Sequence, residues 1–521
     1  MANQTIVKTW VSMAKHHASL LTVLLGSAFV GIWTLLRFFN STTTYDLVTQ
    51  QVLAHSWLHG YTEYIRLGPT NYLLKIFLLY IPTDLLPGSP RLKLIVLTIL
   101  INIVTYLLLF VILRKILSDF KIITNTAYYG AMLWIAVIAG SLFWIGYANS
   151  RNLEVAGGMF LAWSTLHLLR QPTKSNIIGL TAFATLLFFA DSLQIYMVAL
   201  PLFVYAVLLA FFKKINWRRV AILLAVFSAG FMATLVLNSV AQHLLNYSVS
   251  TTGTRGIGLN ISELDQASFS AVRSTLRQFG GGVDGGRLRE IVNLLFLGSG
   301  LTAFIVGTVR RKIPLRFGVF IGVFLVTDEL VYIASGAALL GDTSRYLIML
   351  GPIVALAFGS LGYFYKQSSV PYIVISSMIL INGFFLGQAL AKNWDTSFPK
   401  DNHLASVARY LNSHSYIYAF GSMDVSTPLT YYDGLTHTSI FPIACANSKL
   451  VHADAYRNTR IDKSTIIMPI ILDNKAIANT PNICSEQNII DQLGSPASTD
   501  TTDDGSVVLV FDKVSLIIDL K

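Results

Sequence analysis

Long apolar runs recur through the first three quarters of the chain and alternate with short polar segments. A helix needs roughly 17 to 25 mostly apolar residues to cross the ~30 Å hydrocarbon core of a bilayer. About eleven runs approach or reach this length: residues 18–39, 92–113, 122–145, 154–170, 176–191, 193–212, 218–243, 290–309, 315–338, 345–365 and 370–391. The pattern predicts a polytopic α-helical membrane protein.

The pattern changes in the tail, which is rich in Asn, Asp, Ser and Thr. Short β-type runs occur there with helical periodicity between them, at residues 402–412, 416–420, 466–472, 485–493 and 507–511. Such a mixture is typical of a small α/β domain. We therefore expect a membrane module at 1–391 and a separate domain at 392–521, which is long enough to fold alone.

Composition supports the membrane class. Of the 521 residues, 54% are hydrophobic and 12% are charged, and the mean hydropathy is +0.59. A soluble protein has no use for so much apolar surface. The first run ends at Arg37 without a small-residue cleavage site, so we interpret it as a span and not as a cleaved signal peptide.

The Lys and Arg residues of the short loops predict the orientation, because cations are retained on the cytoplasmic side. Lys8 and Lys15 place the amino terminus in the cytoplasm. Residues 71–82 contain Lys75 and are too short for a span, so we interpret them as an interfacial helix. With that interpretation the basic loops lie inside, whereas the loops 40–91 and 244–289 and the C-terminal domain lie on the periplasmic or extracellular side of the cytoplasmic membrane.

The net charge of +11 follows largely from this loop bias. Anionic lipid headgroups are its natural partner, and no nucleic acid is required. The two cysteines, Cys445 and Cys484, both fall in the exterior tail. A disulfide suits an oxidising compartment, but the spacing equally allows two buried thiols.

Candidate chemistry begins just past the first run. Tyr45-Asp46 is followed by an Ala-Leu-containing helical segment that ends at Gly60, and then by a short polar and aromatic stretch. That stretch contains Glu63, Tyr64 and Arg66 and leads through Gly-Pro-Thr-Asn into the interfacial segment. An acid at the membrane surface, followed by a loop longer and more polar than a simple turn requires, indicates a reaction site.

Two later segments share this side and also carry charged residues. Arg151-Asn152-Leu153-Glu154 precedes one apolar run, and Arg345-Tyr346 opens a late run that contains Pro352. In this order the three segments resemble landmarks of the C-type glycosyltransferase superfamily. Its members are membrane enzymes that use polyprenyl-phosphate sugars, among them protein mannosyltransferases and aminoarabinose transferases. Leu47 follows Asp46 where the mannosyltransferases have an Asp-Glu pair, so the subfamily and the acceptor stay open.

The resemblance implies transfer of a sugar from a polyprenyl-phosphate donor to a glycan, lipid or protein acceptor, with inversion expected. Such transfer needs a base for the acceptor hydroxyl and a cationic site for the leaving phosphate. We assign catalytic roles to Asp46 and Glu154, and the donor phosphate to Arg345 and Arg151, because Arg donates parallel hydrogen bonds to phosphate. The expected substrate-binding residues are Glu63, Tyr64, Arg66 and Asp191.

Structural interpretations compete at each of these positions. Asp46 is suited to cap the helix that begins near Leu47. Glu154 lies at a helix start, where the helix dipole favours an acid. Arg345 has Asp342 as an alternative anionic partner.

No cofactor is required by this interpretation. His55 and His59 have the i, i+4 spacing that presents two imidazoles to one divalent metal, and Glu63 continues the same face. No further ligand is evident, so we assign no metal and keep a divalent cation as the alternative.

Other function classes remain open. Asp328 and Glu329 interrupt an apolar run, and intramembrane acids are costly enough to indicate function. They favour a secondary transporter or lipid flippase, although no inverted repeat is visible. A surface-polysaccharide ligase or polymerase is closer to the main interpretation and differs in the donor. The Gly- and Arg-rich loop 244–289 has no phosphate-loop signature, and substrate gating is its expected role.

Overall fold

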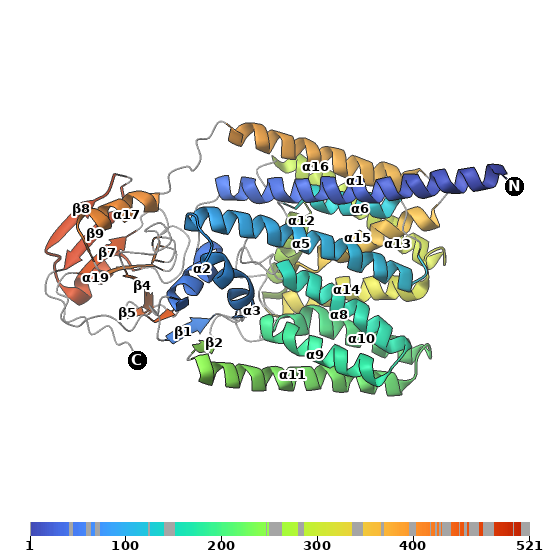
Figure 1. Cartoon of the computed structure of the whole chain (residues 1–521), viewed down its shortest axis with the longest axis horizontal. Coiled ribbons are helices and arrows are strands. Elements are labelled where there is room, and N and C mark those ends of the chain that lie inside the picture. Colours follow the sequence, from blue (N-terminus) through green and yellow to red (C-terminus); the bar gives the residue numbers. More distant parts are fainter. Residues whose placement is uncertain are drawn as a thin grey trace. The chain divides into compact units, whose positions relative to one another are not determined.

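We describe the protein from a computed structural model of the whole chain (Figure 1). The structure describes residues 2–40, 45–58, 64–67, 73–122, 126–139, 152–245, 247–249, 263–279, 286–335, 347–365, 369–394, 403–416, 418–422, 425–426, 429, 439–446, 449–452, 456–457, 468–472, 484–503 and 505–511. The chain divides into two compact units. Unit 1 comprises residues 1–37, 98–238 and 254–394, and unit 2 comprises residues 38–97, 239–253 and 395–521.

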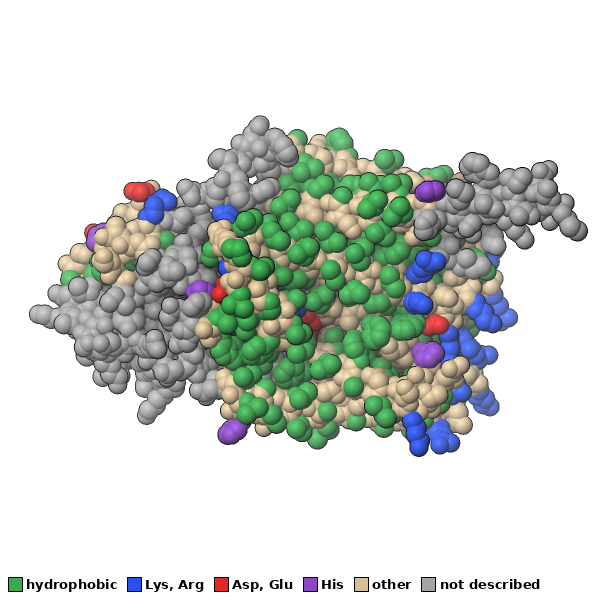
Figure 2. All heavy atoms as spheres, viewed as in Figure 1, with side chains coloured by type: hydrophobic (Ala, Val, Ile, Leu, Met, Phe, Trp, Pro, Cys, Tyr) green, Lys and Arg blue, Asp and Glu red, His purple; other side chains and the backbone are tan. Residues whose placement is uncertain are grey.

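Unit 1 is built from helices. Its helices, in whole or in main part, are α1 (Ala2–Asn40), α5 (Pro90–Asp119), α6 (Thr126–Val137), α8 (Asn152–Arg170), α9 (Lys174–Ala190), the π-helix η2 (Ile195–Ala199), α10 (Leu200–Phe211), α11 (Trp217–Leu245), α12 (Leu264–Gln278), α13 (Gly286–Val309), α14 (Leu315–Ala334), α15 (Leu350–Phe364) and α16 (Val370–Trp394). Several of them expose large apolar side chains over much of their length, as Figure 2 shows. This surface is compatible with a multi-pass membrane protein.

Six helices of the described chain are long and apolar enough to cross a membrane. They lie at His17–Leu36, Pro90–Asp119, Trp217–Leu245, Ile291–Val309, Leu315–Ala334 and Pro371–Gln388. The other predicted spans coincide with α6, α8, α9, the η2–α10 pair and α15. Of these, α6, α9, η2–α10 and α15 are apolar but shorter. Six candidate spans are therefore established, and eleven crossings stay a prediction.

The core of unit 1 forms where α6 and α15 meet. Both helices are buried around most of their circumference, as expected for helices that are apolar on every side. Trp134 of α6 stacks on Phe279 and on Phe358 of α15, with ring centroids 5.7 and 5.3 Å apart. The shortest apolar helices are thus enclosed by the longer ones.

Three helices of unit 1 end in the same turn, with a basic residue in the left-handed region. The residues are Lys121, Lys213 and Arg311, with φ angles of 61°, 54° and 57°. After α5, for example, the N–H of Lys121 donates to the carbonyl of Ser118 and the N–H of Ile122 to that of Leu117, both at 2.9 Å. This pair of bonds is the Schellman arrangement, which usually places Gly in the left-handed position. Cations at these helix ends interact favourably with the negative end of the helix dipole. Figure 2 shows Lys and Arg gathered at one end of this unit.

Unit 2 begins with a helical pair. Helix α2 (Tyr45–Leu58) packs on the continuous helical segment α3 (Leu73–Lys75), η1 (Ile76–Tyr80) and α4 (Ile81–Asp84). The rings of Trp57 and Phe77 lie 5.0 Å apart. The helix expected at 71–82 is thus present over Leu73–Asp84, and these twelve residues span only about 18 Å at 1.5 Å per residue. Phe77 and Leu78 expose 40% and 69% of their surface, which fits a helix lying in an interface.

A three-stranded sheet joins three remote segments of unit 2. Strand β1 (Tyr64–Leu67) pairs in parallel with β2 (Tyr247–Val249) and antiparallel with β6 (Tyr456–Arg457). These strands come from the two long loops and the tail that the charge pattern places on one side. Because a bilayer cannot pass between hydrogen-bonded strands, the three segments lie on the same side of any membrane that the helices cross.

The tail of unit 2 contains a six-stranded mixed sheet in the order β5-β4-β3-β7-β9-β8. Its elements are α17 (His403–Ser413), β3 (Tyr418–Gly421), β4 (Ser439–Ala446), β5 (Lys449–His452), β7 (Met468–Leu472), α19 (Glu486–Leu493), β8 (Ser498–Thr501) and β9 (Val507–Phe511). The predicted helices and strands of this region are confirmed, with ends shifted by up to two residues. Strands β3, β4 and β7 are parallel neighbours, and β9 runs antiparallel to β7.

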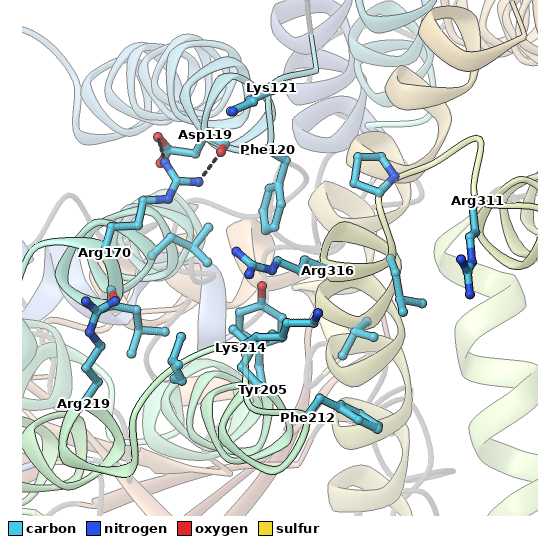
Figure 3. Close-up of a pocket in the computed structure, with 17 residues that line it drawn as sticks. Asp119, Phe120, Lys121, Arg170, Tyr205, Phe212, Lys214, Arg219, Arg311 and Arg316 are labelled. Carbon is cyan, nitrogen blue, oxygen red and sulfur yellow. Dashed lines mark hydrogen bonds and ion pairs between the residues drawn. The ribbon is translucent and has the colours of Figure 1, made fainter.

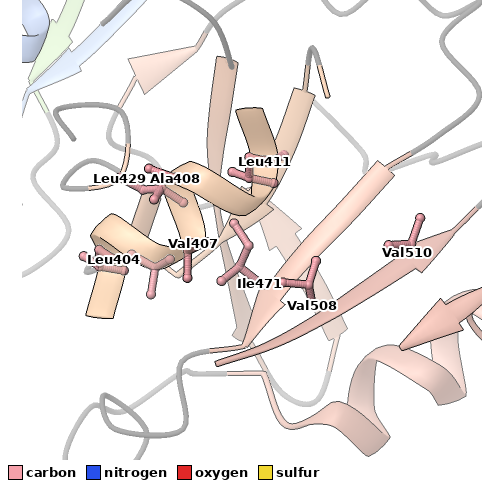
Figure 4. Close-up of a cluster of buried hydrophobic side chains, with 10 residues drawn as sticks. Leu404, Val407, Ala408, Leu411, Leu429, Ile471, Val508 and Val510 are labelled. Atoms are coloured by element: carbon pink, nitrogen blue, oxygen red, sulfur yellow. The ribbon is translucent and has the colours of Figure 1, made fainter. Parts of the chain in front are cut away.

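Alternation along the strands creates two cores. Val508 and Val510 of β9 face α17, where they pack with Ile471 of β7 (Figure 4). The intervening Leu509 and Phe511 face the opposite side, which contains Ile489 of α19 and Cys484. A period of two therefore buries both faces of the sheet.

The tail is also covalently closed. Cys484 is disulfide-bonded, no described cysteine is free, and Cys445 on β4 is the only other cysteine of the chain. The bridge that the sequence left open is therefore formed. It ties the segment that precedes α19 to β4, the second strand from one edge of the sheet.

Candidate functional site

The structure describes only some of the predicted site residues. Asp46 lies in the first turn of α2 and Tyr64 and Arg66 lie on β1, but only their backbone is described. Glu63, Arg151 and Arg345 lie outside the described residues. Asp46, Tyr64 and Arg66 belong to unit 2, whereas Glu154 and Asp191 belong to unit 1. The side-chain geometry of the site can therefore be built around the last two.

Glu154 is a buried carboxylate in the first turn of α8. Only 4% of its surface is exposed. The amino end of a helix favours an acid, because its first N–H groups point outward and carry partial positive charge. Burial of a carboxylate is costly without compensation, so a side chain of this kind is retained only where its surroundings stabilise it.

A chain of polar contacts begins two residues earlier on α8. Asn152 donates from Nδ2 to Oδ1 of Asn102 on α5, and Asn102 donates from Nδ2 to Oγ1 of Thr34 on α1 at 2.9 Å. All three side chains are fully buried. Amides linked in this way connect three helices by directional bonds, which fixes the rotation of α8 about its axis. The direction in which Glu154 points follows from that rotation.

Asp191 forms a second buried acidic position at the same end of the helices. It is fully buried and lies directly after α9. Its Oδ1 accepts from the N–H of Leu193 and its Oδ2 from Nε2 of Gln194, both at 3.2 Å. Because α8 and α9 pack as antiparallel neighbours, the end of α9 lies beside the start of α8.

Gly158 is the point at which these segments meet. It follows Glu154 by four residues, so both lie on one face of α8. A Cβ atom at Gly158 would lie 2.7 Å from Oε1 of Gln194, 2.9 Å from Val198 and 3.1 Å from Cε of Met349. Glycine at this position therefore lets the Asp191–Gln194 turn and the segment before α15 approach α8 closely.

This contact relates two of the predicted landmarks. Met349 follows Arg345 by four residues in the sequence. The structure thus brings Glu154, the turn at Asp191 and the start of the segment that follows Arg345 together around Gly158. Among the described residues, Oε1 of the fully buried Gln194 has no hydrogen-bond donor.

Sequence analysis did not single out Thr34, Asn102, Gly158 or the side chain of Asn152 for the site. Polar residues inside apolar runs were the available signal for Thr34 and Asn102. The role of Gly158 has no sequence signal of its own, because a helical glycine is compatible with both open space and a close contact.

The structure assigns His55 to an ion pair. Its Nδ1 lies 2.9 Å from Oδ2 of Asp84, which joins α2 to α4. His59 and Glu63, the other members of the proposed metal face, lie outside the described residues. No group of three or more metal-binding side chains occurs among the residues that were described.

The acidic pair of α14 has two different environments. Asp328 is 4% exposed, and neither of its carboxylate oxygens has a hydrogen-bond partner within the described part of the chain. Glu329 accepts a hydrogen bond from Oγ1 of Thr275 on α12. One turn further along α14, the hydroxyl of Tyr332 donates to Oγ of Ser274 at 3.2 Å. Helices α12 and α14 are thus joined by two polar contacts within one turn of a buried acid.

Comparison with known proteins does not assign the chain to a family. No family model matches the chain, and a search of curated proteins found no match.

Proposed function

We propose that the protein is an integral membrane glycosyltransferase that moves a sugar from a polyprenyl-phosphate donor to a glycan, lipid or protein acceptor. The reaction would take place on the extracytoplasmic face of the cytoplasmic membrane. The observation that carries the proposal is the contact of two segments with α8 at Gly158, one turn after the buried Glu154. One segment contains Gln194, which donates to the buried Asp191, and the other contains Met349, four residues after Arg345. Both acids, Glu154 and Asp191, belong to loops that the charge pattern places on the exterior side.

This arrangement suits group transfer from a lipid phosphate. A buried carboxylate interacts strongly with a hydroxyl or a developing positive charge, because water screens it little. A base of this kind contributes about 10²–10⁴-fold to the rate. Arg345 would bind the leaving phosphate, since four residues of chain restrict it to within about 14 Å of Met349.

The remaining roles follow from the sequence resemblance. Asp46, in the first turn of α2, is the proposed base for the acceptor, and Arg151 would assist at the phosphate. Tyr64 and Arg66 lie on a strand that two other exterior segments hold in place, so Glu63 and these two residues would contact substrate. The exposed apolar face of residues 73–84 would lie at the extracytoplasmic surface of the cytoplasmic membrane, where the protein would bind the polyprenyl carrier.

A transfer assay tests the proposal. Full-length protein in membranes is offered a panel of polyprenyl-phosphate sugars, and Asp46→Asn and Glu154→Gln are compared with the wild type at equal expression. We expect transfer to fall by about 10²–10⁴-fold in each variant while the donor still binds. Asp503→Asn removes an exposed tail carboxylate and is the matched control, with transfer expected to be unchanged.

The outcomes separate the alternatives. Full activity in both Asp46→Asn and Glu154→Gln would rule out the assigned roles. Transfer of a whole glycan in place of one sugar would identify a surface-polysaccharide ligase or polymerase.

A secondary transporter or lipid flippase is the second candidate, and the buried Asp328 favours it. A carboxyl group without a partner among the described residues, on a helix long enough to span a membrane, has the chemistry of a proton or cation carrier. Uptake or lipid flipping that depends on a pH gradient and is lost in Asp328→Asn, with no sugar transfer from any donor, would establish this function instead.

A further inference from the structure

A pocket lies in unit 1 at the end where the basic residues gather. Its volume is about 620 Å³, and its walls come from the ends of α5, α8 and α10 and the starts of α11 and α14 (Figure 3). The charge pattern predicts that this end faces the cytoplasm. The pocket is therefore separate from the cluster around Gly158, which contains acids of the predicted exterior loops.

Positive charge dominates the lining. Six cations line the pocket: Lys121, Arg170, Lys214, Arg219, Arg311 and Arg316. Asp119 is the one lining acid among the described residues, and its Oδ1 lies 2.6 Å from Nη1 of Arg170. Lys214 and Arg316 have no carboxylate partner in the described part of the chain. Their charge is available to an anion.

Two helices begin at this pocket with arginine in their first turns. Arg219 lies in the first turn of α11 and Arg316 in that of α14, and neither first turn contains an acid. A cation at a helix amino end adds to the positive end of the dipole, which is unfavourable unless an anion is bound. The bias toward cytoplasmic cations accounts for basic residues at this end of the unit, and the helix dipole adds a preference for an anion beside the arginines of α11 and α14.

A buried hydroxyl also lines the pocket. Tyr205 of α10 is 2% exposed, and its hydroxyl has no hydrogen-bond partner among the described residues. Figure 3 shows Tyr205 among the residues that line the pocket, together with Arg316 and Lys214. A phenol donates one hydrogen bond, so Tyr205 and the two cations together offer neutral and charged donors to one acceptor group.

The surroundings of the pocket are apolar. Phe212 and Leu315 line it and are 57% and 60% exposed, and Trp217 on the adjoining turn is 56% exposed. Tryptophan at the end of an apolar helix is typical of the membrane interface. A ligand here would thus contact cations through its head and apolar side chains through the part that follows.

We propose that this pocket binds the phosphate headgroup of an anionic membrane phospholipid, held by Lys214, Arg316 and Tyr205. Basic pockets between membrane helices on the cytoplasmic side suit such headgroups. A soluble phosphate would satisfy the same donors but would leave the apolar rim without a partner. Lipid is therefore the assigned source.

Binding to the purified full-length protein in neutral detergent tests the assignment. The probes are dioctanoyl phosphatidylglycerol, dioctanoyl phosphatidylcholine and inorganic phosphate, with binding followed by native mass spectrometry. We expect saturable binding of phosphatidylglycerol that weakens at least tenfold in the double variant Lys214→Gln/Arg316→Gln. The control is Arg218→Gln/Arg310→Gln, which removes the same charge at the same end from residues outside the pocket, and its affinity is expected to change less than twofold.

Three results would overturn the assignment. Equal weakening in both double variants would mean that the lipid responds to net charge alone. Equal affinity for phosphatidylcholine would exclude recognition of the anionic headgroup. Inorganic phosphate could instead bind as tightly as phosphatidylglycerol and with the same dependence on Lys214 and Arg316. That result would show that the pocket binds a soluble phosphate and not a lipid.

A variant that is less disruptive than the double variants tests the same site with little risk of misfolding. Tyr205→Phe removes one hydroxyl and no charge, and its ring keeps the packing against Phe320 at a centroid distance of 5.4 Å. We expect a threefold or greater loss of phosphatidylglycerol affinity at an unchanged unfolding temperature. Unchanged affinity in this variant would remove Tyr205 from the site and contradict the proposal.

Discussion

Single small or polar residues decide how closely the helices of unit 1 approach. Gly158 admits Gln194 and Met349 to within contact of α8, while Asn102 links Asn152 to Thr34. Because apolar packing has little direction in a membrane, close glycine contacts and interhelical amide bonds are the devices that specify one arrangement. The position of Glu154 depends on both.

Substitution of Gly158 by Ala tests this dependence. The added Cβ would meet Val198 at 2.9 Å and Gln194 at 2.7 Å, so α8 and η2 must move apart. We expect a loss of about 1–3 kcal/mol in stability, seen as a lower unfolding temperature in detergent, together with reduced sugar transfer.

Gly179→Ala provides the matched control. Gly179 is also helical, but nothing lies within 4 Å of its Cβ position, and Ala is expected to stabilise the helix by about 0.5–1 kcal/mol. Equal unfolding temperatures for the two variants would show that the contact at Gly158 is not tight.

At the scale of elements, the tail depends on a sheet covered by a helix on each face. The alternation in β9 directs Val508 and Val510 toward α17 and Leu509 and Phe511 toward α19. Helix α19 has only eight residues, which is too short to be stable by itself. Packing of Ile489 and the bridge at Cys484 therefore hold it on the sheet.

Reduction of the disulfide should loosen this face selectively. The bridge closes a loop of about 40 residues, for which the chain-entropy model gives about 3–4 kcal/mol of stabilisation. Limited proteolysis of the full-length chain with and without reductant is expected to show faster cleavage of the tail after reduction. Cys445→Ser/Cys484→Ser should be cleaved fast under both conditions, and protection of this variant in the absence of reductant would contradict a stabilising bridge.

At the scale of the whole molecule, strand pairing restricts the topology. Strands β1 and β2 are separated in sequence by the helices from α5 to α11, yet Ile65 pairs with Tyr247. An even number of membrane crossings must therefore lie between them. The interpretation of residues 71–82 as an interfacial helix gives six crossings for this stretch, whereas a full span there would make the number odd.

Cysteine labelling of intact cells tests the resulting orientation. Asn216 and Ser495 are exposed residues, one in the basic turn before α11 and the other in the tail. We expect an impermeant maleimide to label Ser495→Cys in intact cells and Asn216→Cys only after permeabilisation. The wild type should stay unlabelled because its two cysteines are bridged. Labelling of both variants from outside would overturn the orientation.

The sequence by itself determined the class of the molecule and the elements of its tail. Apolar runs and charge bias follow from the bilayer as a solvent, so they are readable without contacts. The same holds for β9, a continuous apolar run typical of a strand buried on both faces, and for α19, whose helical period reflects one-sided burial. The candidate residues Asp46, Glu154 and Asp191 were also identified from their local patterns, and their assigned roles stay predictions.

Only the tertiary structure decided which segments meet. Pairing of β1 with β2 and β6, contact of Met349 with Gly158 and convergence of Lys214, Arg316 and Tyr205 each join residues far apart in the chain. Such contacts depend on shape complementarity and interhelical hydrogen bonds, and neither produces a periodic pattern of residues in the sequence. The physical reason is that local patterns record which face of an element is buried, whereas a site depends on which other element buries it.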